Sequence, residues 1–143
     1  MMQEIIANFK VLRCLRKNIW LSILKLKEMQ NEKLRILLKH AYDNVEYYRR
    51  LFDSAGIRPI DIKDCEDISR IPITTKRDLR DAKDIIIAKN TKIWVQHKTS
   101  GSTGLPIILH STMKDAIYSR GMYERARTEN GFRILRDKLA YVG

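Results

Sequence analysis

Residues 99–106 read Thr-Ser-Gly-Ser-Thr-Gly-Leu-Pro, and this octapeptide constrains the fold and the function more than any other segment. Its two glycines permit backbone conformations with positive φ, which can turn successive N–H groups toward a ligand. Four hydroxyl side chains lie beside them and can donate hydrogen bonds to phosphate oxygens. Consecutive N–H groups in such a turn form a concave anion-binding site. The segment therefore predicts a loop that holds the phosphates of a nucleotide.

The residues on either side of this loop favour β-structure. Residues 93–97 read Ile-Trp-Val-Gln-His and residues 107–110 read Ile-Ile-Leu-His, so both are rich in strand-forming side chains. We therefore expect the loop to join two antiparallel strands. It is not a Walker A motif, because Leu105 and Pro106 follow its second glycine, and it lacks the G-x-G-x-x-G pattern of dinucleotide-binding folds. A glycine- and serine-rich hairpin without a ligand is the alternative.

The octapeptide and its flanks resemble the phosphate-binding loop of the adenylate-forming, AMP-producing ligases. Residues 31–56 resemble a helical segment of the phenylacetate–coenzyme A ligase family and of its capsular-polysaccharide-biosynthesis relatives. Residues 57–79 resemble the next segment of that family. It ends in a Pro-x-x-x-Lys-x-Asp-Leu pattern, represented here by Pro72, Lys76, Asp78 and Leu79.

The similarity continues beyond the loop and covers the chain from about residue 31 to residue 143. Arg120 and residues 130–137 resemble the family's next helix and the strand that follows it. Leu105 departs from the pattern, because the family often has a lysine there, so a cation near the phosphates is missing. Relatives on the polysaccharide side vary at this position, and we therefore place the chain nearer to them. Glu46 and Arg136 also depart, where many members have proline and glycine.

The resemblance implies a reaction, a set of cofactors and a set of site residues. In the full reaction a carboxylate attacks the α-phosphorus of ATP, pyrophosphate leaves, and the acyl group passes from the adenylate to a thiol or another acceptor. The implied cofactors are ATP and Mg²⁺, with coenzyme A as a candidate acceptor. The residues assigned to the β- and γ-phosphates are Thr99, Ser100, Gly101, Ser102, Thr103 and Gly104. No catalytic base or acyl pocket is assigned.

The expected fold is α/β, with a helical N-terminal segment followed by the start of the large N-terminal domain of an adenylate-forming enzyme. At 143 residues the chain is far shorter than such a ligase and lacks the family's downstream motifs. We therefore expect one truncated domain that is inactive alone, with a missing C-terminal portion as its partner. A non-catalytic remnant or one half of a split enzyme is the alternative. Its expected segments are a helical part (1–56), short helices and a connector (57–92), the phosphate-loop hairpin (93–111), and a helix with the start of a sheet strand (112–143).

Local patterns predict where the helices begin and end. Apolar residues recur every three or four positions from Ile5 to Leu26, which predicts one helix face. The same period continues toward Phe52, with a break at residues 43–44, where Asn44 would cap a second short helix. Gly56 and Gly131 are expected helix stops. Ser, Thr or Asp three residues before an acidic residue predicts helix starts at Asp64, Thr75 and Thr112.

The charge balance of 28 basic and 17 acidic residues gives +11 and leaves other function classes open. A basic helical protein that binds nucleic acid is one alternative, but no known nucleic-acid-binding motif is visible and we expect no DNA partner. The aromatic residues between Tyr42 and Phe52 suit base stacking or, as we favour, a core. The N-terminal helix with Trp20 has the composition of a helix that lies on a membrane surface, although packing on the protein body is favoured.

Cysteines and histidines point to no metal site or disulfide. Cys14 and Cys65 form no C-x-x-C pattern and are expected as free thiols in a reducing, cytoplasmic environment. The three histidines are dispersed, at positions 40, 97 and 110, so we expect no metal centre. No run of about 18 apolar residues predicts a transmembrane helix.

Overall fold

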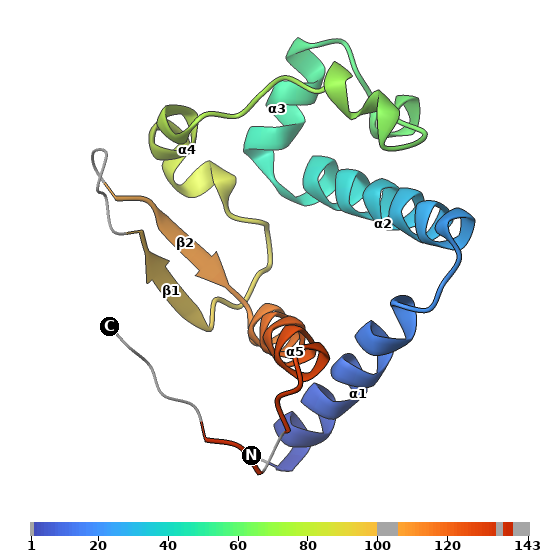
Figure 1. The fold of residues 1–143 in the computed structure, drawn as a ribbon. Coiled ribbons are helices and arrows are strands. Elements are labelled where there is room, and N and C mark those ends of the chain that lie inside the picture. Colours follow the sequence, from blue (N-terminus) through green and yellow to red (C-terminus); the bar gives the residue numbers. More distant parts are fainter. Residues whose placement is uncertain (1, 100–105, 134–135, 139–143) are drawn as a thin grey trace. The chain divides into compact units, whose positions relative to one another are not determined.

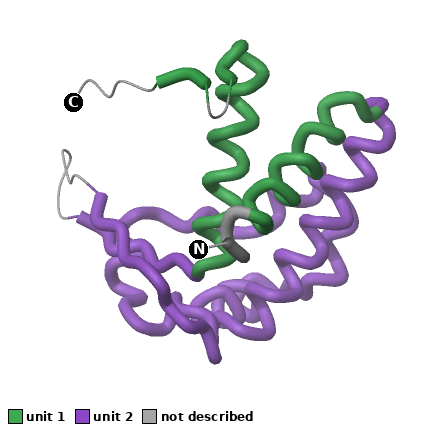
Figure 2. The backbone as a smooth tube through the Cα atoms, turned by 90° about the horizontal axis from the view of Figure 1, so that it is seen from below, with its two compact units in different colours: residues 1–21, 113–143 green, residues 22–112 purple. Residues whose placement is uncertain are grey.

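A computed structural model of the chain describes residues 2–99, 106–133 and 136–138 (Figure 1). The elements in these residues are, in chain order, α1 (Met2–Asn18), α2 (Ile23–Asn44), α3 (Glu46–Ser54), η1 (Pro59–Asp61), η2 (Glu66–Arg70), α4 (Lys76–Ala82), η3 (Lys83–Ile86), β1 (Val95–Lys98), β2 (Ile108–Ser111) and α5 (Met113–Glu129). The elements labelled η are short 3₁₀ helices. The chain divides into two compact units, residues 1–21 with 113–143 and residues 22–112 (Figure 2).

The continuous apolar period from Ile5 to Leu26 does not form one helix, so that prediction is wrong. α1 ends at Asn18, and the next three residues donate their N–H groups to carbonyls three positions back, which makes a tight turn. α2 then begins after Ser22, whose hydroxyl accepts the N–H of Lys25 at 3.4 Å. A serine at this position satisfies one of the free N–H donors of the first turn. A local cap thus divides a stretch whose hydrophobic pattern is unbroken.

The core of residues 22–112 lies where α2, α3 and the segment after α3 meet. Its buried members are Leu34, Leu38, Phe52, Ile57 and Ile62. Phe52 and Ile62 are 1% and 0% exposed. The Tyr42 ring meets Phe52 edge to face, with 6.0 Å between the ring centroids. Tyr42 and Phe52 therefore belong to the core or pack against it, which is the role that the sequence analysis favoured over base stacking.

The junction of α2 and α3 lies where the sequence predicts a break, but Asn44 does not cap the second helix. The residue before α3 is Val45, which has no side-chain cap. The Asn44 amide instead donates to the His40 carbonyl of its own helix at 3.0 Å. At the other end of α3, Gly56 has φ +64°, a conformation that favours glycine and ends the helix as predicted.

Thr75 and Asp78 form the predicted capping box at the start of α4. The Asp78 carboxylate accepts the Thr75 hydroxyl at 2.6 Å and the Thr75 N–H at 2.7 Å, and the Thr75 hydroxyl accepts the Asp78 N–H at 3.3 Å. The hydrogen bond from the Thr75 side chain, followed by the one from its backbone, lowers the pKa of Asp78 below its ordinary value. The carboxylate's contribution to stability is therefore complete above the unfolded-state pKa of about 3.9 and is lost as the pH falls through the lower folded-state value.

Replacing Thr75 with valine is expected to raise the pKa of Asp78 toward its ordinary value, because the larger of the two stabilising hydrogen bonds disappears. The measurement is an NMR titration of the Asp78 carboxyl carbon between pH 2 and 6, the range around an ordinary aspartate pKa of about 3.9. Thr91→Val is the matched control, because Thr91 lies in the connector before β1, away from the box. An Asp78 titration midpoint that is the same in Thr75→Val and in the unmodified chain would contradict the expectation.

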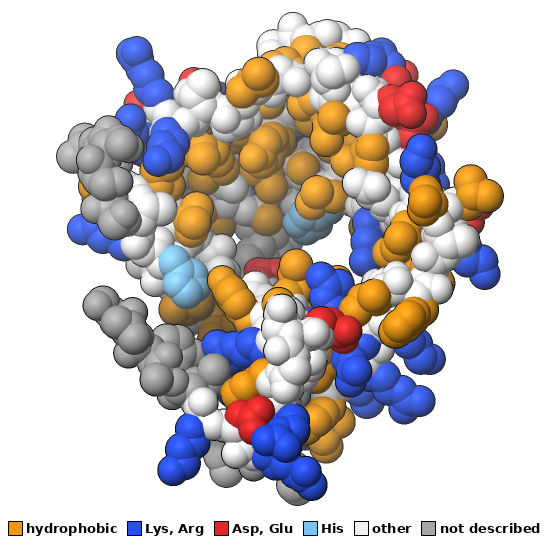
Figure 3. Space-filling view, in the orientation of Figure 1, with side chains coloured by type: hydrophobic (Ala, Val, Ile, Leu, Met, Phe, Trp, Pro, Cys, Tyr) orange, Lys and Arg blue, Asp and Glu red, His pale blue; other side chains and the backbone are white. Residues whose placement is uncertain are grey.

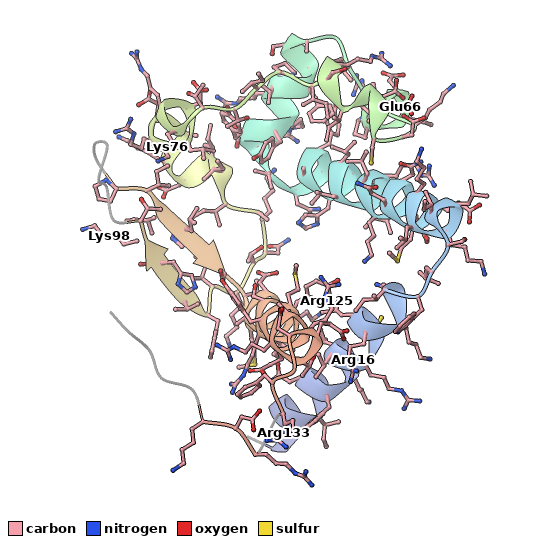
Figure 4. The ribbon with its side chains drawn as sticks, in the orientation of Figure 1. Arg16, Glu66, Lys76, Lys98, Arg125 and Arg133 are labelled. Atoms are coloured by element: carbon pink, nitrogen blue, oxygen red, sulfur yellow. The ribbon has the colours of Figure 1, made fainter. Side chains whose placement is uncertain are left out.

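In the other unit, α1 packs along α5. Leu12 and Leu15 are buried, which confirms that part of the apolar stripe of α1 packs within the protein. Arg16, labelled in Figure 4, joins the two helices through an ion pair with Glu129 at 3.1 Å. None of the helices in the described residues is both long and apolar enough to cross a membrane.

The end of α5 follows the prediction, whereas the start of the expected final strand does not. Gly131 has φ +88°, and the N–H of Phe132 reaches back to the carbonyl of Arg127 at 3.0 Å, which closes the helix. Asp137, where the strand would begin, lies in a turn instead. Its carboxylate accepts the N–H of Arg133 at 2.8 Å and pairs with the Arg133 guanidinium at 3.0 Å. The rest of that predicted strand, residues 139–143, lies outside the described residues.

Candidate functional site

The two strands that flank the glycine-rich loop pair in antiparallel fashion, which confirms the predicted arrangement. Val95 lies opposite Ser111, and Lys98 lies opposite Ile108. The strands begin slightly later than expected, at residues 95 and 108 instead of 93 and 107. The pairing of Lys98 with Ile108 brings the two ends of the loop together.

Thr99 closes the base of this loop with both its backbone and its side chain. Its N–H donates to the carbonyl of Ile107 at 3.0 Å, and its hydroxyl oxygen accepts the N–H of Ile107 at 2.9 Å. The hydroxyl hydrogen of Thr99 remains able to donate to a ligand. The other predicted phosphate-binding residues, Ser100, Gly101, Ser102, Thr103 and Gly104, lie outside the described residues.

Side chains on the hairpin alternate between two faces, as in any strand pair. Gln96 and its partner His110 share one face, where the Gln96 amide nitrogen lies 3.1 Å from Nε2 of His110. Lys98 lies on that face at the end nearest the loop, and Figure 4 shows its side chain pointing away from the hairpin. Lys98 is exposed and pairs with no carboxylate in the described part of the chain. It is therefore a free cation directly beside the predicted phosphate site.

The hairpin offers donors for an anion, and its sequence has no carboxylate. Residues 93–111 contain no Asp or Glu. Among all the described residues, no group of three or more His, Cys, Asp or Glu side chains is arranged to hold a metal. Beside the loop, the described groups that can donate to an anion are the Lys98 ammonium and the Thr99 hydroxyl.

A second feature, which the sequence did not indicate, is a basic pocket in the unit of residues 22–112. It has a volume of about 740 Å³ and is lined by α2 and by the segment that contains η1. Four basic side chains take part in the lining: Arg35, Lys39, Arg58 and Lys63. The spacing of Arg35 and Lys39 on one helix face is visible in the sequence. Their approach to Arg58 and Lys63 depends on how the chain folds back after α3.

Elsewhere basic side chains are spread over the surface instead of forming one block. Figure 3 shows Lys and Arg side chains (blue) across the face drawn there, with Asp and Glu side chains (red) among them. Several acidic groups in the described residues take part in ion pairs within one helix, such as Glu46 with Arg50 and Glu124 with Arg127. The basic pocket differs from this mixed surface, because its lining has four basic side chains and one acidic side chain, that of Asp43.

Comparison with known proteins relates the chain to one class of ligase. It is 40% identical over 96 residues to the phenylacetate-coenzyme A ligase of Escherichia coli (strain K12), a match that covers 66% of this chain and 22% of the ligase. It is 38% identical over 93 residues to the enzyme of the same name from Aromatoleum evansii, covering 64% of this chain and 21% of the ligase. The chain matches no protein-family model.

Its fold is similar to part of a crystal structure of 2-hydroxyisobutyryl-CoA ligase in complex with 2-HIB-AMP and CoA in the thioesterification state. The TM-score is 0.58 and the identity 27%, over 66% of this chain and 22% of the ligase. The chain is thus a homologue of phenylacetate-coenzyme A ligases, and its helix-rich fold with a two-stranded sheet matches the N-terminal part of an adenylate-forming ligase. It spans about a fifth of the length of the curated relatives, for which the match covers 22% and 21%.

Proposed function

We propose that this chain, a homologue of the N-terminal part of adenylate-forming coenzyme A ligases, supplies the phosphate-binding loop of an ATP-dependent, AMP-forming carboxylate ligase. The observation that carries the proposal is the octapeptide at residues 99–106, held between two antiparallel strands. The identity of 40% to a phenylacetate-coenzyme A ligase supports the same activity class.

In this proposal residues 99–104 bind the β- and γ-phosphates of ATP. Gly101 and Gly104 allow the backbone N–H groups to approach the phosphate oxygens, because no Cβ intervenes. The hydroxyls of residues 99, 100, 102 and 103 donate further hydrogen bonds. Fixed donors of this kind stabilise charge on the leaving pyrophosphate without reorganisation during the reaction. Lys98, which is exposed and has no carboxylate partner in the described residues, adds a positive charge beside the loop, whose own sequence has leucine where the family often has lysine.

Other parts of the active enzyme are proposed to come from outside residues 1–143. Within this chain no side chain is assigned as a catalytic base or as the wall of an acyl pocket. The carboxylate, coenzyme A as acceptor, and the groups that hold Mg²⁺ would meet this loop in the assembled enzyme. When bound there, Mg²⁺ would neutralise negative charge on the leaving pyrophosphate. Leu105 favours the polysaccharide-biosynthesis type of carboxylate ligase over the type that acts on phenylacetate.

The test is ATP binding to the purified chain, measured by equilibrium dialysis. We expect weak, saturable binding, because in this proposal the chain contacts the phosphates of ATP and not its adenine or ribose. Replacing Gly101 with valine should weaken it at least about tenfold, equivalent to roughly 1.4 kcal/mol, because a branched side chain blocks the approach of the backbone to the phosphates. Ser119→Ala, on the exposed side of α5, is the control and should leave the affinity unchanged.

Two results would contradict the proposal. The first is the absence of saturable ATP binding, or equal binding by Gly101→Val and the unmodified chain. The second is formation of an acyl-adenylate by this chain alone. Incubated with ATP and phenylacetate, the chain should form none, because the catalytic groups are proposed to lie outside residues 1–143. Turnover at an ordinary enzymatic rate of about 1 s⁻¹ or more would show that residues 1–143 contain the catalytic groups as well.

A further inference from the structure

The basic pocket on residues 22–112 lies apart in sequence from the glycine-rich loop and has its own set of charges. Its lining carries the four cations named above and a single carboxylate, that of Asp43. The carboxylate is already engaged, because the Lys39 ammonium lies 2.6 Å from Asp43 Oδ2. The pocket therefore has a surplus of positive charge that its own acidic residue does not neutralise.

Two of the cations keep their charge unpaired. Arg35 donates through Nη1 to the backbone carbonyl of Lys63 at 2.9 Å, a neutral acceptor. Neither Arg35 nor Lys63 has a carboxylate within ion-pair distance among the described residues. Arg58 is partly compensated, since its guanidinium lies 5.5 Å from the centroid of the Tyr42 ring and 3.9 Å from Asp53 Oδ1. Arg35 and Lys63 are thus the groups available to an anion.

The backbone that presents these cations is fixed by hydrogen bonds. The N–H of Arg58 donates to Asp61 Oδ2 at 2.8 Å, and the N–H of Lys63 donates to Asp67 Oδ2 at 2.9 Å. Arg70 adds a bond from its guanidinium to the Asp61 carbonyl at 2.9 Å. A binding site whose backbone is already ordered loses less conformational freedom when a ligand arrives.

Apolar groups complete the pocket. Tyr42, Pro59 and Ile60 line it beside the cations, and Ile60 is 85% exposed although it is fully apolar. A single exposed isoleucine is ordinary. Beside two unpaired cations, it offers contact to the hydrocarbon part of a ligand whose other end is an anion.

We propose that this pocket binds a soluble phosphomonoester that carries an aromatic or alkyl group. A guanidinium presents parallel N–H donors that match two phosphate oxygens, and an ammonium adds a compact charge, so Arg35 and Lys63 suit a dianionic phosphate better than a carboxylate. Tyr42, Pro59 and Ile60 receive the hydrocarbon part. This inference does not rest on the proposed function of the loop and concerns a separate ligand.

The test is a titration of the full 143-residue chain with phenyl phosphate, in which isothermal titration calorimetry measures the affinity. We expect saturable binding that weakens as salt is added. Lys63→Gln and Arg35→Gln should each weaken it about tenfold, because each removes a charge-assisted contact. Lys33→Gln is the matched control, since Lys33 is an exposed lysine of α2 outside the pocket lining, and it should change the affinity by less than about twofold.

A loop variant separates this site from the phosphate loop. Gly101→Val should leave phenyl phosphate binding unchanged, and its loss in that variant would place the ligand at the loop and overturn the assignment. Equal weakening by Lys33→Gln and Lys63→Gln would show non-specific attraction to a basic protein, which also overturns it. The absence of saturable phenyl phosphate binding would also overturn the assignment, provided that circular dichroism shows the chain to be folded.

Two further titrations test the chemical class of the ligand. Phenylacetate should bind at least about tenfold more weakly than phenyl phosphate, because it offers one charge instead of two. Equal affinity would overturn the assignment of a phosphate. The second titration uses vesicles of phosphatidylcholine with phosphatidic acid, a lipid whose headgroup is a phosphomonoester like that of phenyl phosphate. Binding to these vesicles without binding to phenyl phosphate would overturn the assignment of a soluble ligand.

Discussion

Replacing Phe52 with alanine is expected to lower the free energy of unfolding of residues 22–112 by about 3–5 kcal/mol. Phe52 is 1% exposed and belongs to the cluster that joins Leu34 and Leu38 of α2 to Ile57 and Ile62. Its removal deletes a buried ring, leaves a cavity and takes away the edge-to-face partner of Tyr42. Since small domains are stable by only about 5–15 kcal/mol, such a loss is a large part of the total.

Urea unfolding followed by far-ultraviolet circular dichroism measures this effect. Phe52→Leu should cost less than Phe52→Ala, because most of the volume is kept. Phe9→Ala is the control of the same residue type, since Phe9 is 52% exposed and lies in the other unit. A loss of stability in Phe52→Ala no larger than in Phe9→Ala would show that the cluster does not hold the unit together.

Gly121→Leu is expected to have the second largest effect, by separating α1 from α5. A Cβ at Gly121 would lie 2.6 Å from Val11 Cγ1 and 3.3 Å from Val11 Cβ. Valine has essentially one rotamer in a helix, so Val11 cannot turn away and the helices must move apart. Overpacking of this kind costs about 1–3 kcal/mol, which exceeds the gain of about 1 kcal/mol from removing a helical glycine. We therefore expect net destabilisation, greater for leucine than for alanine.

A control and a rescue variant distinguish this clash from a general effect of leucine in α5. Ser119→Leu adds the same side chain at an exposed position two residues earlier and should leave stability nearly unchanged. Val11→Ala opens space at the contact and should recover part of the stability of Gly121→Ala. Thermal melts of the single and double variants give the coupling between the two positions. Additive effects would contradict direct contact between them.

Several features of the fold follow from short stretches of sequence. The capping box of Thr75 and Asp78 forms as predicted, and Gly56 and Gly131 adopt the positive φ that ends a helix. The antiparallel pairing of the strands beside the loop was also expected from their composition. Each of these depends on residues a few positions apart, for which the backbone geometry is decided locally. The resemblance to coenzyme A ligases rests on such local motifs as well.

Other features depended on competition between local interactions that the pattern of apolar residues does not reveal. The helix predicted through Leu26 breaks because Ser22 caps a new one. Asn44 bonds back to His40 within its own helix instead of capping the next. Asp137 engages Arg133 in a turn where a strand was expected. In each case one polar side chain makes a local hydrogen bond that the spacing of apolar residues does not predict.

By itself the sequence predicted the strands on either side of residues 99–106 and the class of ligase to which the chain is related, and both are confirmed. The phosphate-binding role of that loop stays a prediction from the sequence. Only the tertiary structure showed that Arg35 and Lys63 meet in one pocket and that Gly121 packs against Val11. The physical reason is distance along the chain. A loop or a cap is decided by neighbours, whereas a pocket or a helix contact joins residues tens of positions apart, whose meeting depends on how the core around Phe52 and the pairing of α1 with α5 fold the chain.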